Sequence, residues 1–188
     1  AGCRNLQFDD CVWGGMVNPK LAVALTGRSG EALEEYKKLM LKLNNEVAAA
    51  APDDLLINTH VCRGNYHSTF FSSGAYDSVA DLLFGEENVN AYYLEYDDER
   101  SGGFAPLAKV SGDKKVVLGL VTTKTPALEN KELVINRIHE AAKYVPLDRL
   151  YLSPQCGFAS CEIGNKLTEE EQWAKLKLVK EIAEEVWG

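Results

Sequence analysis

The stretch Leu56-Ile57-Asn58-Thr59-His60-Val61-Cys62-Arg63-Gly64-Asn65 joins an apolar run to two soft metal ligands, and a polar loop follows directly. Side chains alternate along an extended strand, so His60 and Cys62 fall on the same side of the backbone. We therefore expect these two residues to form half of a metal site at the end of a buried strand.

Two further strand-like runs end in residues that complete such a site. One run ends in Glu95, and the other, residues 150–157, contains Cys156. Imidazole, thiolate and carboxylate donors together suit zinc. The candidate metal ligands are His60, Cys62, Glu95 and Cys156. For the first two alone, a buried strand end without function is the simpler interpretation. A disulfide between Cys62 and Cys156 is the main structural alternative, which a reducing compartment disfavours.

The composition indicates a single folded domain. The chain has 188 residues, and its apolar fraction of 46% is enough to build a core. Its 20 basic and 28 acidic residues give a net charge of −8 without a basic block, so nucleic acid is not an expected partner. No apolar run approaches the ~20 residues that span a bilayer, and the first residues do not resemble a signal peptide. We expect a soluble cytoplasmic protein that has no membrane partner.

Strand-like and helix-like segments alternate along the chain. Apolar runs predict strands at residues 6–8, 55–59, 90–94, 116–121 and 150–152. Apolar spacings of three and four predict helices at residues 30–50, 76–84, 104–110 and 131–144, and a last helix that starts at Thr168 with an apolar stripe from Trp173 to Val186. Residues 21–26 are expected to be a brief strand or a loop. Alternation without hairpin turns predicts a parallel sheet with helical crossovers.

The chemically interesting residues follow the carboxyl ends of the predicted strands, where active sites lie in parallel α/β folds. They are Asp9, His60, Cys62, Glu95, Lys124 and Cys156. A closed barrel has eight strand-helix units and ~250 residues, whereas five units are predicted here. The chain is therefore either an open sheet or the last five units of a barrel. A partial barrel would expose two sheet edges, so we expect a homo-oligomer or a missing N-terminal barrel segment as partner.

Four short motifs resemble the catalytic barrel of the cobalamin-independent methionine synthase family. They are Gln7-Phe8-Asp9, Asn58-Thr59-His60-Val61-Cys62, Leu94-Glu95 and Ser153-Pro154-Gln155-Cys156-Gly157. The resemblance covers essentially the whole chain in order, and it is strongest to short bacterial methionine-synthase-like proteins. It implies a (β/α)8 TIM barrel of the methionine synthase and uroporphyrinogen decarboxylase type. Residues 1–188 would then be the C-terminal part of a single catalytic domain that lacks its first three units.

The resemblance also implies an activity. In the family, a zinc ion binds homocysteine as a thiolate, and the sulfur takes a methyl group from 5-methyltetrahydrofolate (polyglutamate) to give methionine. His60, Cys62, Glu95 and Cys156 would be the zinc ligands, and Asp9 would hold the amino group of homocysteine. Asp9 as a loop cap or as a partner of Arg4 is an equal alternative.

One position departs from the family. Lys124 stands where the full-length enzymes have a histidine that handles the proton on the folate donor, so Lys124 is the candidate catalytic acid and the identity of the donor stays open. A related zinc-thiol alkyltransferase with another donor or thiol is therefore an alternative function, and a non-catalytic truncated fragment with structural zinc is another. Cys3, Cys11 and Cys161 are expected to be small buried hydrophobic residues.

Overall fold

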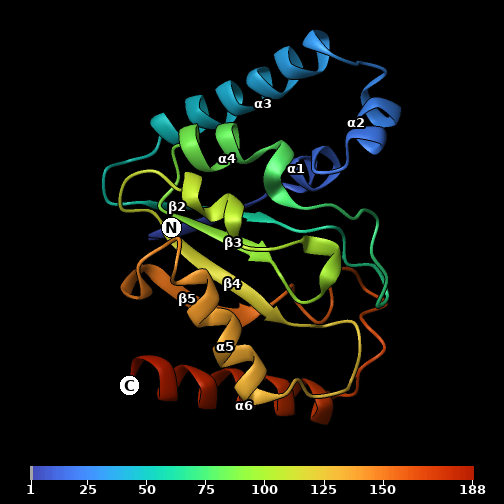
Figure 1. The fold of residues 1–188 in the computed structure, drawn as a ribbon, viewed down its shortest axis with the longest axis vertical. Helices are drawn as coiled ribbons and strands as arrows, with labels where there is room; N and C mark the ends of the chain where they lie inside the picture. The colour runs from blue at the N-terminus through green and yellow to red at the C-terminus, as the bar shows by residue number, and fades with distance from the viewer. Residues whose placement is uncertain (1) are drawn as a thin grey trace.

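The computed structural model describes residues 2–188 and has the predicted parallel sheet (Figure 1). Its strands are β1 (Asn5–Asp9), β2 (Leu56–Val61), β3 (Ala91–Glu95), β4 (Lys115–Val121) and β5 (Leu150–Pro154). They pair in chain order, and every pair is parallel. A doubly wound sheet reverses its strand order at a switch point, whereas a barrel adds each strand on the same side of the last. The fold is therefore an arc of a (β/α) barrel.

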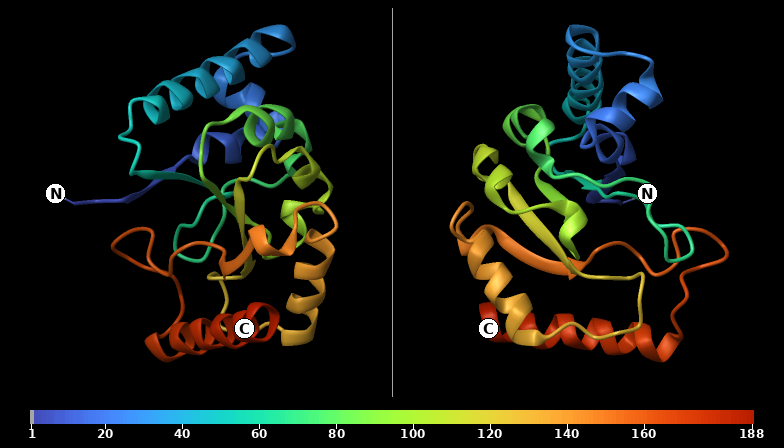
Figure 2. Two further views of the ribbon diagram at one scale, coloured as in Figure 1. Left: turned by 90° about the vertical axis from the view of Figure 1, so that its left-hand side faces the viewer. Right: turned by 45° about the vertical axis from the view of Figure 1, so that its right-hand side comes forward.

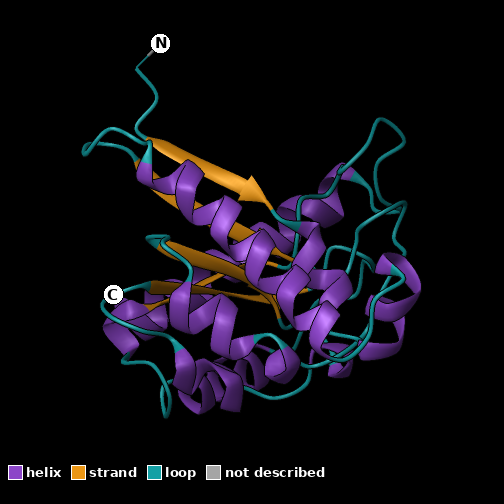
Figure 3. Ribbon diagram, turned by 90° about the horizontal axis from the view of Figure 1, so that it is seen from above, coloured by secondary structure: helices purple, strands orange, loops and turns teal. Residues whose placement is uncertain are grey.

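Helices cover the outer face of this arc, and loops gather at the carboxyl ends of the strands (Figures 2 and 3). The α-helices are α1 (Cys11–Met16), α2 (Pro19–Thr26), α3 (Glu31–Ala49), α4 (Ala80–Glu86), α5 (Lys131–Ala141) and α6 (Glu169–Trp187). Short 3-10 turns lie at η1 (Tyr76–Ser78), η2 (Glu99–Ser101), η3 (Ala105–Lys109) and η4 (Leu147–Arg149). None of the helices within residues 2–188 combines the length and apolar character needed to cross a bilayer.

The core lies between the sheet and its helices. Tyr92, Leu94, Val116 and Leu118 alternate along β3 and β4 and are almost completely buried under the helices. The intervening side chains point to the inner face of the arc, where those at the amino ends of the strands line a cavity of about 470 Å³. Because side chains alternate along each strand, the apolar ones on the outer face of the sheet pack against the helices. Those on the inner face line the cavities and are available for binding or catalysis.

The N-terminal region is more helical than expected. Residues 11–16 and 19–26 form α1 and α2, so a strand or loop at residues 21–26 is wrong. The reason is local, because the Asn18 side chain accepts hydrogen bonds from the Lys20 and Leu21 amides. Pro19 occupies the first turn, where a proline is favoured. Asn18-Pro19 therefore begins a helix.

The buried face of α6 also differs from its predicted stripe. The capping box from Thr168 to Glu171 is confirmed, but Trp173 is 60% exposed. The buried side chains are Lys175, Leu178 and Ile182, and the Lys175 ammonium donates to the Glu129 carboxylate. An ion pair therefore sets the rotation of this helix, which the apolar pattern did not reveal. By contrast, the predicted inward face of α5 is confirmed by the burial of Val134, Ile138, Ala141 and Val145.

A small acidic cluster is buried between β1, α3 and the end of α4. The Asn44 amide donates to Asp10 Oδ2 at 2.5 Å and to Glu87 Oε1 at 2.8 Å. The second oxygen of Glu87 has no hydrogen-bond partner among the described residues. Burial raises the pKa of the Glu87 carboxyl to about 7, against an ordinary value of 4.5. Folding thus favours the protonated form of this carboxyl.

This carboxyl makes stability depend on pH. The pKa of the Glu87 carboxyl is higher in the folded protein than in the unfolded chain. Its contribution to the stability of the fold is therefore fully present below pH 4.5 and is lost as the pH rises through about 7. The lost free energy is on the order of 3 kcal/mol. We expect the stability of Glu87→Gln relative to wild type to rise by this amount in urea unfolding between about pH 4 and about pH 8. The exposed Glu86→Gln is the control, and a pH-independent difference for Glu87→Gln would contradict the prediction.

Candidate metal centre

The carboxyl edge of the sheet brings together side chains that are far apart in the sequence. The strand register places Asp9 of β1 beside His60 of β2, and Cys62 follows β2 directly. Cys156 follows β5 at the other end of the arc. These residues line one cavity of about 550 Å³ on the inner face. Asp9, His60, Cys62 and Cys156 therefore meet at the edge of the sheet where the sequence predicts them.

Three of the four predicted ligands form a compact group. The candidate ligand atoms of His60, Cys62 and Cys156 all lie within 4.8 Å of one another. His60 Nε2 lies 3.3 Å from Cys156 Sγ, and the Gly64 amide approaches Cys62 Sγ at 3.4 Å. The cysteines are free, so no disulfide joins Cys62 to Cys156. One imidazole and two thiols are a donor set that fits zinc and leaves a fourth position for another ligand.

The electrostatics of this group favour a thiolate at Cys62. Hydrogen bonds from the Cys11 and Cys156 thiols, followed by the effect of His60, lower the pKa of Cys62 far below its ordinary value, although burial opposes the shift. Burial disfavours the charged form of His60, yet the Cys62 thiolate and the Asp9 and Glu95 carboxylates together raise its pKa. The negative charge of this group therefore favours the binding of a proton or a cation.

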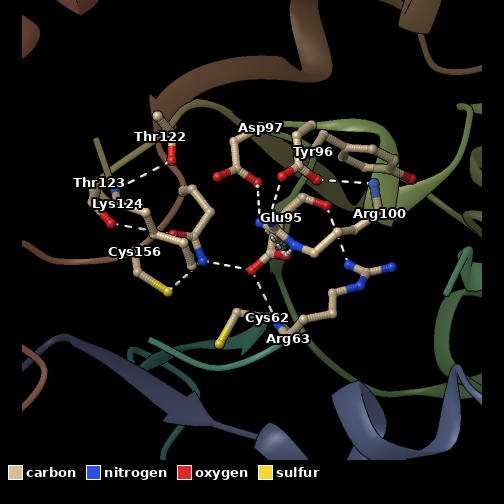
Figure 4. A network of polar contacts seen from close by, with 12 residues as sticks. Cys62, Arg63, Glu95, Tyr96, Asp97, Arg100, Thr122, Thr123, Lys124 and Cys156 are labelled. Atoms are coloured by element: carbon tan, nitrogen blue, oxygen red, sulfur yellow. Dashed lines mark hydrogen bonds and ion pairs between the residues drawn. The ribbon is translucent and has the colours of Figure 1, made fainter. Parts of the chain in front are cut away.

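Glu95, the fourth predicted ligand, lies next to the group but is engaged elsewhere (Figure 4). Its carboxylate is fully buried, and Oε2 accepts from the Arg63 amide at 3.0 Å and from Gln155 Nε2 at 2.5 Å. Its other oxygen pairs with the Arg100 guanidinium at 3.2 Å. The same Gln155 amide nitrogen lies 2.8 Å from Cys156 Sγ, so Gln155 stands between Glu95 and Cys156. The role of Glu95 as a metal ligand stays a prediction.

Lys124 is buried behind Gln155. Its side chain is 8% exposed, and its ammonium donates to Gln155 Oε1 at 2.6 Å. The Thr123 hydroxyl lies 3.2 Å from the same oxygen. A lysine ammonium is only a donor, so it turns the amide nitrogen of Gln155 toward Glu95 and Cys156. Lys124 does not line the cavity, and its predicted role as an acid is not tested by this arrangement.

Asp9 lies at the mouth of the site. Its side chain is 71% exposed, its Oδ1 is 3.9 Å from His60 Nε2, and it lines the cavity. Arg4 pairs with Asp54, so the alternative pairing of Arg4 with Asp9 is wrong. An accessible carboxylate beside the candidate metal position is suited to binding a cationic group, as predicted for an amino group.

Residues 1–185 match the family described as the cobalamin-independent synthase, catalytic domain. This chain belongs to that family. The match spans nearly the whole chain and agrees with the barrel arc. The fold expected from the family resemblance is therefore confirmed.

Known relatives are longer than this chain. The uncharacterized protein YxjG of Bacillus subtilis is 50% identical over 187 residues, which are 99% of this chain and 49% of the relative. A 5-methyltetrahydropteroyltriglutamate–homocysteine methyltransferase of Bacillus licheniformis is 25% identical over 82% of this chain and 18% of its own length. A solved structure from Listeria monocytogenes, assigned provisionally as a vitamin-B12-independent methionine synthase, is 41% identical with a TM-score of 0.72. It covers all of this chain, which spans 49% of that protein.

The site of this family member contains residues that the sequence analysis did not assign. Cys3 and Cys11 are exposed, so the expectation that they are buried hydrophobic residues is wrong, and Cys161 is only partly buried. Cys11 lines the cavity, and its spacing from Asp9 repeats the His60-x-Cys62 spacing, which was an available signal. No comparable signal marks the contacts of Gln155, because the fold alone creates them.

Loss of one thiol tests the metal centre. We expect the wild-type protein to bind an equimolar amount of zinc through His60, Cys62 and Cys156. Cys156→Ser should lose most of this zinc because a hydroxyl is a much poorer ligand than a thiolate. Cys161→Ser, five residues further along the same loop, is the matched control and should retain it. Zinc content after dialysis, measured by atomic absorption, checks this; equal zinc in wild type and Cys156→Ser would contradict it.

Proposed function

We propose that this chain carries the metal and thiol half of a methyltransferase site, in which the sulfur of homocysteine is methylated to give methionine. The convergence of His60, Cys62 and Cys156 on the inner wall of the barrel arc is the observation that supports this function. The family and the named Bacillus licheniformis relative support the reaction class. Because the chain spans about half of several relatives, residues outside it are proposed to complete the substrate pocket.

Each residue of the site has a role that follows from its position. Zinc, when bound, lowers the pKa of a coordinated thiol so that the thiol reacts as a thiolate at neutral pH. Asp9, exposed at the cavity mouth, binds the substrate ammonium and aligns the sulfur with the cluster. Cys62 and Cys156 add negative charge, which keeps the bound sulfur electron-rich. Gln155 fixes the orientation of Cys156 through its amide.

Methyl transfer also needs a leaving group. The sulfur forms a bond to the methyl carbon as the carbon–nitrogen bond of methyl-folate breaks, and the nitrogen keeps the electron pair and requires a proton. We propose Lys124 as the source of that proton. An alternative function, thiol alkylation from another donor, is favoured by one observation, because the Lys124 ammonium is bound to Gln155 and does not line the cavity.

Donor competition tests the proposed reaction. We expect the zinc-loaded protein to form methionine from homocysteine, faster with methyl-folate polyglutamate than with a simple methyl donor such as a methylated thiol. Addition of homocysteine should add one sulfur to the zinc shell in X-ray absorption spectra. A zinc shell that does not change, together with no methyl transfer, would indicate structural zinc. A changed shell with a strong preference for another donor would support the alternative alkyltransferase.

Two substitutions at Lys124 test its role as an acid. Lys124→Met removes both the proton and the hydrogen bond to Gln155, whereas Lys124→Arg keeps a charged donor that does not release its proton at neutral pH. We expect both variants to lose about 10²- to 10⁴-fold in kcat with methyl-folate, with zinc content unchanged. Recovery of the wild-type rate and pH profile in Lys124→Arg would show that the residue only positions Gln155.

A further inference from the structure

A short hairpin, residues 64–71, follows β2 and reaches the loop that joins β5 to α6. The two loops lie side by side in both views of Figure 2. Within the hairpin, the Tyr66 amide donates to the Thr69 carbonyl at 3.1 Å, and the Thr69 amide donates to the Tyr66 carbonyl at 2.8 Å. This pairing leaves His67 and Ser68 as the two residues of the turn.

The turn of this hairpin is strained. His67 has φ 46° and Ser68 has φ 65°, so both residues are in the left-handed region. Positive φ at both central positions is the pattern of a type I′ turn, for which Asn-Gly is the preferred sequence. A residue with a Cβ pays a conformational cost there. Two such residues in succession therefore need contacts from outside the turn to hold them.

The loop between β5 and α6 supplies those contacts. His67 Nδ1 lies 3.0 Å from the Gly164 carbonyl oxygen. The Ser68 amide donates to Asn165 Oδ1 at 3.0 Å, and the Ser68 hydroxyl accepts from the Lys166 amide at 2.8 Å. Three successive residues of one loop thus bind the two turn residues of the other.

Asn165 is the centre of this contact. Its side-chain nitrogen donates to Asn65 Oδ1 at 3.0 Å and to the Thr123 carbonyl at 2.7 Å, while its oxygen accepts from the Ser68 amide. A side-chain amide has two donor hydrogens and an acceptor oxygen, and all of them are used here. One side chain therefore joins the loops that follow β2, β4 and β5.

The hairpin in turn forms part of the cavity at the carboxyl edge. The Asn65 side chain donates to the Gly157 carbonyl at 2.9 Å and to the Ser160 hydroxyl at 2.7 Å. Asn65, Gly157 and Ser160 all line the cavity of about 550 Å³. On its other side, the hairpin places the Phe70 ring 4.4 Å from the Arg100 guanidinium. The position of the hairpin therefore determines the position of this part of the cavity wall.

We propose that Asn165 is a positioning residue of the site, which holds the hairpin against the loop between β5 and α6 and so fixes the cavity wall at Asn65. The inference rests on the proposed methyl transfer, because in-line attack of a sulfur on a methyl carbon requires two substrates in alignment. Asn165 does not itself line the cavity. It acts through the hairpin and not by contact with a substrate.

Steady-state kinetics of Asn165→Ala test this role. We expect kcat for methionine formation to fall about 10- to 100-fold, since a wall that shifts misaligns the reacting groups. The KM for homocysteine should stay close to that of wild type because Asp9 lies on β1, outside the joined loops. Zinc content should not change. Glu162→Ala, at an exposed residue of the same loop, is the control and should keep the wild-type kcat. A wild-type kcat in Asn165→Ala would overturn the inference.

A rescue experiment tests whether Asn165 acts through the strained turn. The replacements His67→Asn and Ser68→Gly, made together in Asn165→Ala, create a turn that adopts positive φ without outside contacts. We expect them to restore most of the lost kcat. A purely general loss of stability would not be repaired by the geometry of one turn, so an absence of recovery would overturn the proposed route through the hairpin.

Hydrogen exchange measured by mass spectrometry separates this inference from the proposed function. In Asn165→Ala, amides of residues 64–71 should exchange faster by more than about tenfold, because hydrogen bonds that oppose local opening are lost. Amides of β3 and β4 should be unaffected. If the wild-type protein forms no methionine, the proposed function fails, and faster exchange still shows that Asn165 holds the hairpin. Unchanged exchange in residues 64–71 would overturn the inference whether or not the protein is active.

Discussion

The buried carboxylate of Glu95 is the interaction on which the geometry of the site depends. It is fully buried at the end of β3, where it accepts from the backbone after β2 and from Gln155 after β5. The Arg63 guanidinium donates to the Glu95 carbonyl and lies 4.0 Å from the centre of the Tyr76 ring. A buried charge is tolerated only when it is paired and hydrogen-bonded. The need to satisfy this one carboxylate therefore binds three strand ends together.

That constraint arranges the thiols before any metal is present. Arg63 immediately follows Cys62, and Gln155 immediately precedes Cys156, so the two partners of Glu95 are chain neighbours of two candidate ligands. Preorganisation of this kind reduces the conformational entropy lost when a ligand binds. It also sets a competition, because a carboxylate that organises the site must break these contacts to serve as a ligand itself.

The fold explains why the chemistry is confined to one face. Alternation places Tyr92 and Leu94 under the helices and directs Tyr93 and Glu95 inward, and the same holds on each neighbouring strand. In the described chain, β1 and β5 are the outer strands of the arc, and the cavity lies on the inner face between them. The chain spans about half the length of the YxjG protein and of the Listeria monocytogenes structure, which agrees with the proposal that further residues complete the pocket.

The sequence by itself determined the parallel strands, the edge at which the candidate site residues meet and three residues of the candidate metal centre. These features follow from local patterns, since apolar runs form strands, alternation sets their faces and parallel strands end at a common edge. Only the tertiary structure decided that Glu95 binds Arg63, Arg100 and Gln155 and that Lys124 lies behind Gln155. It also decided that Cys11 lines the cavity and that Lys175, and not Trp173, faces inward from α6. These contacts join buried charged groups to partners that are far apart in the sequence. The spacing of residues along the chain does not predict such distances.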